Sequence, residues 1–226
     1  MKLMSEADFQ AAASLELIKP SRSNATGDGS TAITPTILRQ LFEACSKDHT
    51  AAGRRDAAML AIFLSSGLRR AEAAMLDVGD HDPKTGRLHI RGERPEYDRL
   101  VTLGAPARQA VGDWLAVRSS EPGPLLLPVD RGGIVRFRRM TDQAIYDIFS
   151  RMVARTETAG VTLRDLRRAY VISLIRSGKP LDEVQYLIGH ASWFSTTAYQ
   201  ELATKKESEG YDVEHLPYQP LKGGTS

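Results

Sequence analysis

A glycine turn followed by arginines stands at residues 66–72, which read Ser-Gly-Leu-Arg-Arg-Ala-Glu. Gly67 predicts the end of one helix, and Arg69 then falls in the first turn of the next. Backbone N–H groups and a guanidinium meet at such a helix start, and together they suit an anion such as a phosphodiester. A surface arginine is the alternative interpretation of this segment taken alone.

A second group of arginines opens a helix predicted to start at Thr162. Residues 162–170 read Thr-Leu-Arg-Asp-Leu-Arg-Arg-Ala-Tyr. Because Arg164 and Arg167 are three residues apart, they share a helix face and are spaced to clamp one phosphate. Packing of a core helix that carries incidental arginines is the competing interpretation.

The third segment contains a histidine and a tyrosine. His190 follows Gly189, which is predicted to end a helix, and Tyr199 stands nine residues later in a helix capped by Ser195. A lone histidine or tyrosine is usually structural. Neither spacing nor periodicity makes Tyr199 a nucleophile.

The elements that must position these residues are mostly helical. Apolar spacing and capping residues predict helices at 35–45, 53–66, 68–76, 105–117, 141–156, 162–178, from residue 180, and at 195–202. Leu88 and Ile90 alternate with polar residues, and a second apolar run follows at 100–103, which predicts one antiparallel hairpin. The predicted fold class is mostly α with a small antiparallel β-sheet.

Length and composition fit one domain with short flanking segments. The chain has 226 residues, of which 42% are hydrophobic. We expect a short helix and flexible linker over 1–33, one domain over 34–202 and a tail over 203–226. No apolar run approaches the roughly 18 residues of a membrane span, and the N-terminus lacks the core of a signal peptide. Cys45 is the only cysteine, which excludes an internal disulfide framework. A cytoplasmic protein with no membrane partner is the expectation.

The net charge of +2 conceals an uneven distribution of arginine. Of the 30 basic residues 22 are arginines, and the stretch 131–168 carries nine arginines against four acids, a local charge of +5. Arginine binds phosphate in a bidentate manner that lysine cannot reproduce, so the stretch predicts a surface that faces phosphate. A solvated helix face is the alternative.

Taken together in this order, the segments resemble the catalytic domain of the tyrosine recombinase (phage integrase) family. The shared pattern is G-L-R-x-x-E, a hairpin, D-L-R-R, and L-x-G-H with S-T-T-x-Y, whose tyrosine stands nine residues after that histidine. The resemblance covers about residues 34–202, and the closing box at 187–199 is its most specific part. The combination is far more specific than any one segment.

The resemblance implies a role for each matching residue. Arg69 and Arg167 would be the catalytic arginines, Glu72 their acidic companion, His190 the histidine of the closing box, and Tyr199 the nucleophile. In this family the tyrosine attacks a DNA phosphodiester, forms a 3′-phosphotyrosyl bond and frees a 5′-hydroxyl, and a partner strand's 5′-hydroxyl reverses the step. The family needs no ATP, metal or other cofactor. Cations around the phosphoryl oxygens would stabilise both the phenolate and the developing charge.

Two positions depart from the family pattern. By alignment on Gly92, Glu93 stands where the family usually has a lysine that protonates the leaving 5′-oxygen. Arg91 and Arg94 flank it, and we assign Arg94 a supporting role, although arginine is a weak proton donor.

Arg164 stands where the family usually has a histidine, three residues before the second arginine. It keeps a cation there but cannot act as a base, and we include it in the catalytic set. We assign contacts with DNA phosphates to a further group of arginines: Arg70, Arg91, Arg136, Arg138, Arg139 and Arg168.

The N-terminal segment 1–33 is too short for the separate core-binding domain that these recombinases usually carry. The chain therefore resembles the family's short, catalytic-domain-only members, or a piece trimmed from a longer protein.

The leading hypothesis is a site-specific recombinase that acts on double-stranded DNA at the nucleoid. We expect a homotetramer on two DNA sites, or assembly with a partner recombinase, and residues 203–207 are placed to dock on a neighbouring subunit. A second hypothesis keeps the fold and the DNA but drops the chemistry, giving an accessory or regulatory protein that is weak or inactive in cleavage. A third, a helical transcription regulator, would leave the closing box to coincidence.

Overall fold

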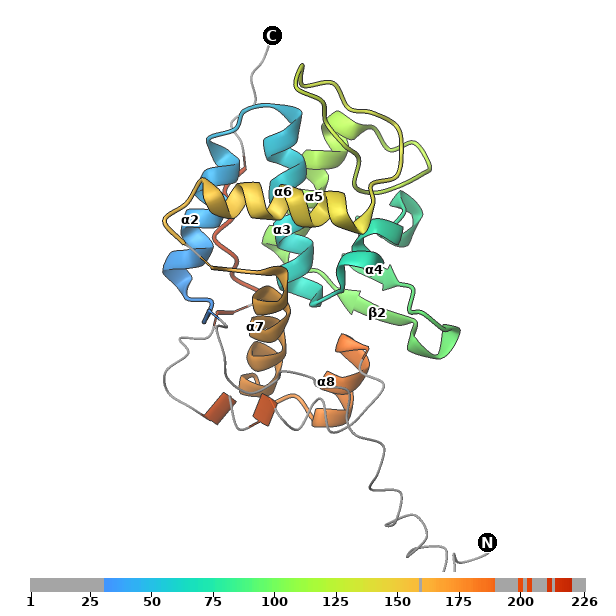
Figure 1. Cartoon of the computed structure of the whole chain (residues 1–226). Coiled ribbons are helices and arrows are strands. Elements are labelled where there is room, and N and C mark those ends of the chain that lie inside the picture. Colours follow the sequence, from blue (N-terminus) through green and yellow to red (C-terminus); the bar gives the residue numbers. More distant parts are fainter. Residues whose placement is uncertain are drawn as a thin grey trace, which may run out of the picture.

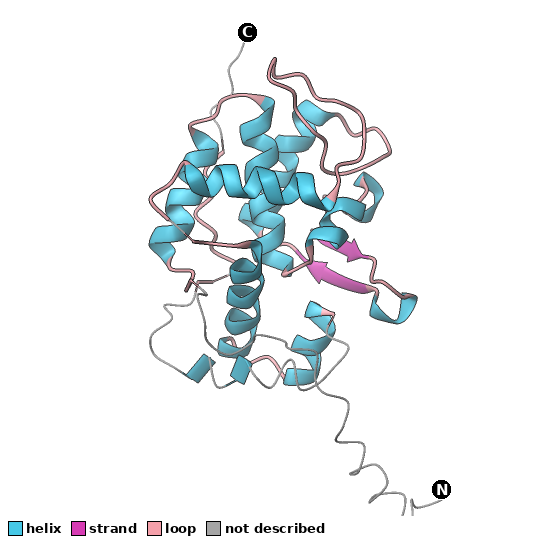
Figure 2. Ribbon diagram, viewed as in Figure 1, coloured by secondary structure: helices cyan, strands magenta, loops and turns pink. Residues whose placement is uncertain are grey.

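The computed structural model describes residues 31–158, 160–189, 199–200, 203–204, 211–212 and 214–220. Helices gather around one central helix, and a single hairpin projects from one side (Figures 1 and 2). The helices are α2 (Pro35–Ser46), α3 (Ala51–Ser66), α4 (Arg70–Met75), α5 (Ala105–Arg118), α6 (Asp142–Ala154), α7 (Leu163–Arg176) and α8 (Leu181–Ile188). The strands are β1 (Arg87–Ile90) and β2 (Arg99–Thr102), and short 3-10 turns lie at Val78–Asp80 and Pro95–Tyr97. The predicted fold class is confirmed. No helix in this part of the chain is long and apolar enough to cross a membrane.

Helix α3 forms the centre of the core because it is apolar nearly all round. Every side chain from Ala57 to Leu64 is at most 2% exposed. The helices α2, α5, α6 and α7 all pack against α3. The helix begins at Ala51, two residues earlier than predicted, since the Thr50 hydroxyl caps it by accepting the N–H of Ala52 at 3.1 Å.

Threonine hydroxyls start three of the other helices, as the sequence predicted. Thr34, Thr141 and Thr162 each accept the backbone N–H three residues on, at 3.1 to 3.3 Å. These bonds satisfy N–H groups that have no partner inside the helix. They fix the starts of α2, α6 and α7, and the last of these carries Arg164 and Arg167.

Helix α4 is shorter than predicted, and Arg69 lies before it rather than in its first turn. The carboxylate of Glu72 accepts the backbone N–H of Arg69 at 2.6 Å, which holds Arg69 as an extended N-cap residue. The helix therefore starts at Arg70. The side chain of Arg69 bonds to Glu72 of this helix and also reaches the residue that ends α8, Gly189.

The hairpin is antiparallel, with Arg87 opposite Thr102 and Ile90 opposite Arg99. Its inner face buries Leu88, Ile90 and Val101 against the core. Arg99 lies on the same inner face, because side chains two positions apart on a strand point the same way. The hairpin thus carries one arginine into the interior.

The described part of the C-terminal segment, 211–212 and 214–220, has no helix or strand, yet it packs on the core. Tyr211 is buried and its hydroxyl donates to the carbonyl of Leu64 in α3 at 2.7 Å. The ring of Tyr218 meets Phe42 of α2 edge-on, with centroids 6.0 Å apart. In Figure 1 this segment, coloured red, passes behind α6.

Stability toward acid should depend on His81, which is buried and has no hydrogen-bond partner for either ring nitrogen among the described residues. Burial lowers the pKa of His81, so the folded state binds its proton less readily than the unfolded state does. The free energy of unfolding should therefore fall as the pH drops below about 6.5. His81→Phe should raise it by about 1 kcal/mol at pH 7.5, and by more at pH 5.

Urea unfolding of wild type and variant at both pH values measures this difference. His49→Asn, at an exposed position, is the control and should stay within about 0.5 kcal/mol of wild type. If the free energy of unfolding depended on pH equally in wild type and in His81→Phe, His81 would not be the source of the sensitivity to acid.

Candidate active site

A buried carboxylate, that of Glu72, organises the candidate site. Arg99 donates to its two oxygens at 2.9 and 2.8 Å, and Arg69 donates to it from Nη1 at 3.3 Å. The Glu72 residue is 8% exposed and the Arg99 side chain 1%, whereas the Arg69 side chain is 44% exposed. Burial acts to raise the pKa of Glu72, but the bonds from Arg99 and from the Arg69 backbone outweigh it and lower that pKa. The carboxylate is therefore held ionised between two arginines.

The C-terminal end of α8 is held by three arginines from three different elements. Consecutive backbone carbonyls there each accept a hydrogen bond from a guanidinium. The pairs are Arg99 Nε with Leu187 at 2.9 Å, Arg167 Nη2 with Ile188 at 2.6 Å, and Arg69 Nη2 with Gly189 at 3.1 Å. The last carbonyls of a helix lack partners inside it and carry the negative end of its dipole, so cations are favoured there.

Arg167 joins this group to the end of the central helix. Its Nη1 donates to the carbonyl of Gly67, the left-handed residue that ends α3. Burial lowers the pKa of Arg167 to about 10, and the positive charge of Arg69 adds to the effect. Three guanidiniums with one carboxylate leave a local excess of two positive charges, and an anion bound at the exposed Arg69 would reduce this repulsion.

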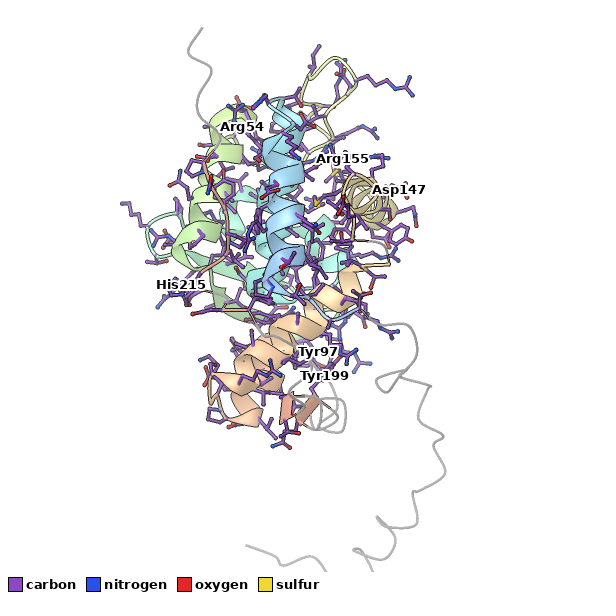
Figure 3. All side chains as sticks on the ribbon, turned by 90° about the vertical axis from the view of Figure 1, so that its left-hand side faces the viewer. Arg54, Tyr97, Asp147, Arg155, Tyr199 and His215 are labelled. Atoms are coloured by element: carbon purple, nitrogen blue, oxygen red, sulfur yellow. The ribbon has the colours of Figure 1, made fainter. Side chains whose placement is uncertain are left out.

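Tyr199 lies within electrostatic reach of Arg167. It packs against a small apolar cluster between α7 and α8, and a negative charge on its phenol oxygen would raise the pKa of Arg167. The cluster consists of Tyr170, Val171, Leu174, Val184 and Ile188. Figure 3 shows Tyr199 beside the ribbon of α7. His190 and residues 191–198 lie outside the described residues.

Among the described residues, the other predicted catalytic and supporting arginines, Arg164 and Arg94, make no hydrogen bond or ion pair with this group. Arg164 is exposed on the first turn of α7, with no hydrogen bond or ion pair to the described residues. Arg94, 71% exposed in the hairpin connection, has a long contact of 3.8 Å with Glu96. Glu93 is exposed in the same connection. Of the residues predicted for catalysis, Arg69 and Arg167 meet at the end of α8, and Tyr199 lies within electrostatic reach of Arg167.

Most of the arginines predicted to contact DNA are paired with aspartates. The pairs are Arg70 with Asp142, Arg91 with Asp77 and Asp80, Arg139 with Asp77, and Arg136 with Asp130. Arg138 is exposed and Arg168 half-buried. The local charge of +5 counted over 131–168 thus overstates the positive surface, because Asp77 and Asp130, outside that stretch, neutralise two of its arginines.

Arg99 is the residue of this group that the sequence reasoning missed. It stands alone among apolar residues of a strand and belongs to none of the arginine clusters. Its signal was the register of the hairpin: Val101 faces inward, so Arg99, two residues earlier, faces inward as well. A buried arginine needs hydrogen-bond acceptors for its guanidinium, and for Arg99 these are the carboxylate of Glu72 and the carbonyl of Leu187.

Metal ligation has no candidate in this part of the molecule. Among the described residues, no group of three or more His, Cys, Asp or Glu side chains is placed to hold a metal ion.

Comparison with known proteins identifies the family. The sequence pattern of the phage integrase family matches residues 32–206. The chain belongs to the phage integrase family. The resemblance drawn from its motifs is therefore confirmed.

Relatives in the phage integrase family include tyrosine recombinase XerC of Shewanella amazonensis, 30% identical over 81% of this chain and 60% of the relative. Among solved structures, the crystal structure of XerA recombinase aligns with a TM-score of 0.66 at 22% identity, over 81% of this chain and 64% of that one. XerH site-specific recombinase bound to palindromic difH substrate aligns with a TM-score of 0.61 at 21% identity, over 78% of this chain and 51% of that one. This chain spans about 60% of the length of the curated relatives it matches.

The packing around Gly189 predicts a sharp sensitivity to substitution. Gly189 has φ +60°, and a Cβ there would lie 2.8 Å from Nη1 of Arg99. Because Arg99 is fixed by three bonds, Gly189→Ala should lower the free energy of unfolding by about 2 kcal/mol or more.

The matched control is Gly112→Ala, in the exposed part of α5 where a Cβ meets no atom within 4 Å. In that variant the free energy of unfolding should rise by about 0.5–1 kcal/mol, because alanine favours the helix over glycine. Denaturant unfolding measures both changes, and equal stability of the two variants would argue against the tight packing at Gly189.

Proposed function

We propose that this chain is the catalytic part of a site-specific DNA recombinase that cleaves and rejoins DNA through a 3′-phosphotyrosyl intermediate. The observation that carries the proposal is the convergence of three guanidiniums with a single carboxylate beside Tyr199. Such a group offers uncompensated positive charge to an anion and a phenol to attack it. The family membership supports the same reading.

The proposed step exchanges one phosphodiester for another. The Tyr199 oxygen attacks phosphorus, the bond to the 5′-oxygen breaks, the phenol loses its proton and the departing oxygen gains one. Arg69 and Arg167 would bind the non-bridging oxygens, where negative charge grows in the transition state. His190 would donate a further hydrogen bond to those oxygens. Attack by a 5′-hydroxyl on the phosphotyrosine reverses the step with bond energy conserved.

Arginines outside the centre would place the duplex. In the proposed complex Arg138, Arg164 and Arg168 contact phosphates, as do the arginines that are paired with aspartates in the free protein. XerH, described as bound to palindromic difH substrate, supports DNA as the partner. Strand exchange joins two duplexes, so we propose four subunits on two sites, formed by this chain alone or with a partner recombinase at the nucleoid.

A suicide DNA substrate, whose cleaved end diffuses away, tests the nucleophile. The wild-type protein should form an adduct with DNA that survives denaturation, and Tyr199→Phe should form none because it lacks the attacking oxygen. Arg167→Ala should slow adduct formation by at least a hundredfold, as expected for loss of one charge-stabilising donor, worth about 3 kcal/mol. Denaturing gels follow the adduct over time.

Tyr218→Phe is the matched control, since Tyr218 packs against Phe42 and donates to Asp113, away from the arginines. It should form adduct at the wild-type rate. If Tyr199→Phe formed a covalent adduct with DNA, Tyr199 could not be the nucleophile.

A second candidate function, a DNA-binding accessory protein, is favoured by one feature of the hairpin. Glu93, exposed in the connection between the strands, stands where the family usually has its proton-donating lysine. Under this alternative the wild type binds DNA but forms no adduct. Glu93→Lys should then create or increase adduct formation at least tenfold, because a lysine can protonate the leaving oxygen.

Glu93→Gln is the control for the loss of negative charge alone. Equal gains in Glu93→Lys and Glu93→Gln would show that charge, and not the proton donor, limits cleavage.

A further inference from the structure

Arg99 lies too deep to touch a substrate. Its side chain is 1% exposed, and its three nitrogens all donate within the protein: Nε to the carbonyl of Leu187, and Nη1 and Nη2 to the two oxygens of Glu72. It comes from β2, whereas Glu72 belongs to α4 and Leu187 to α8. One buried side chain therefore ties together three elements that lie far apart in the sequence.

We propose that Arg99 is a positioning residue, which sets the place of Arg69 and of the end of α8 for the cleavage step. The inference rests on the proposed function, because Arg69 is assigned there to the phosphoryl oxygens. Arg99 acts through other residues and does not contact the DNA.

The first path from Arg99 to Arg69 runs through Glu72. Arg99 fixes both carboxylate oxygens by a bidentate pair, the strongest geometry for arginine and a carboxylate. The same carboxylate accepts the backbone N–H of Arg69 at 2.6 Å and its Nη1 at 3.3 Å. The orientation of the Arg69 guanidinium thus follows from the orientation that Arg99 gives to Glu72.

The second path runs through the backbone of α8. Arg99 holds the carbonyl of Leu187, and Arg69 holds the carbonyl of Gly189 two residues later. Gly189 fits there only because it lacks a side chain, since a Cβ would lie 2.8 Å from Arg99 Nη1. The chain continues from this point into His190. Arg99 thereby fixes the backbone from which the closing box begins.

Charge gives Arg99 a further effect on Arg69. With Arg99 present, three guanidiniums face one carboxylate, and Glu72 is mostly neutralised by its bidentate partner. Without Arg99 the carboxylate would pair with Arg69 alone and draw its charge away from a phosphate. The exposed arginine keeps its positive charge available because the buried arginine balances Glu72.

Arg99→Lys is the informative variant, because it keeps the charge but loses the planar fork that binds Glu72 and Leu187 together. Adduct formation at saturating DNA should slow at least tenfold, with DNA affinity within threefold of wild type. The matched control is Arg55→Lys, another buried arginine paired with a carboxylate, that of Asp56. It stands eleven residues before the end of α3, about 16 Å along the helix. Arg55→Lys should leave the cleavage rate within twofold.

Hydrogen exchange supplies a readout that needs no cleavage. The amide of Gly189 bonds to the carbonyl of Tyr186 at 3.1 Å, so its exchange rate reports opening of the end of α8. In Arg99→Lys this rate should rise at least tenfold while amides of α2 stay unchanged, and in Arg55→Lys it should not rise. If Arg99→Lys fails to fold, the double variant E72Q/R99M replaces it, because it removes both charges of the buried pair at once. Its cleavage rate and the exchange rate of its Gly189 amide are then measured.

The outcomes separate the two proposals. A wild-type protein that forms no adduct contradicts the proposed strand cleavage, whatever Arg99 does. Unchanged exchange at Gly189 in Arg99→Lys, or an unchanged cleavage rate in a protein whose wild type cleaves, overturns the positioning role. The positioning role would also be overturned if Arg55→Lys slowed cleavage as much as Arg99→Lys does. The effect would then be a general destabilisation of the protein.

Discussion

The buried ion pair between Glu72 and Arg99 is the interaction on which the arrangement of the site depends. A charge removed from water must have a partner, and removing one member of a buried pair costs about 3–5 kcal/mol because the other is left uncompensated. Here the partners come from α4 and β2, so this ion pair ties the hairpin to the short helix. Arg69 and the end of α8 take their places from this pair.

The two helices next to Tyr199 are joined to the rest of the molecule both by the packing of α7 on α3 and by the arginines of this site. The main core surrounds α3, while α7 and α8 enclose a separate, small apolar cluster. Arg167 bridges the two, since it holds the end of α3 at Gly67 and the end of α8 at Ile188. Burial lowers the pKa of Arg167, and the positive charge of Arg69 lowers it further. An anion at Arg69 would stabilise the junction.

The outer arginines differ physically from the central ones. Arg91, Arg136 and Arg139 are held by aspartates at the surface, where such pairs contribute little stability because water and salt screen them. A phosphate that took the place of an aspartate would meet a guanidinium already held in position. The central arginines are held by backbone carbonyls and one carboxylate, so their positive charge exceeds that of their partners.

Much of the fold could be read from local signals. Threonine caps at Thr34, Thr141 and Thr162, the apolar run of α3 and the left-handed glycines Gly67 and Gly189 are each decided within a few residues. The start of α4 could not be read in this way. It depends on the carboxylate of Glu72 capping Arg69, and that carboxylate is held in turn by an arginine from β2.

The sequence by itself determined the helical fold class, the hairpin and the family, because these follow from motifs and local periodicity. The resemblance to the family then predicted that Arg69, Arg167 and Tyr199 share one centre. Only the tertiary structure decided which arginines outnumber the carboxylates around them and which are paired with an aspartate. Arg99 carried no local signal beyond its place in the strand, and Asp77 neutralises Arg139 from 62 residues away. Pairing between charges depends on distances in space, which the order of residues along the chain does not contain.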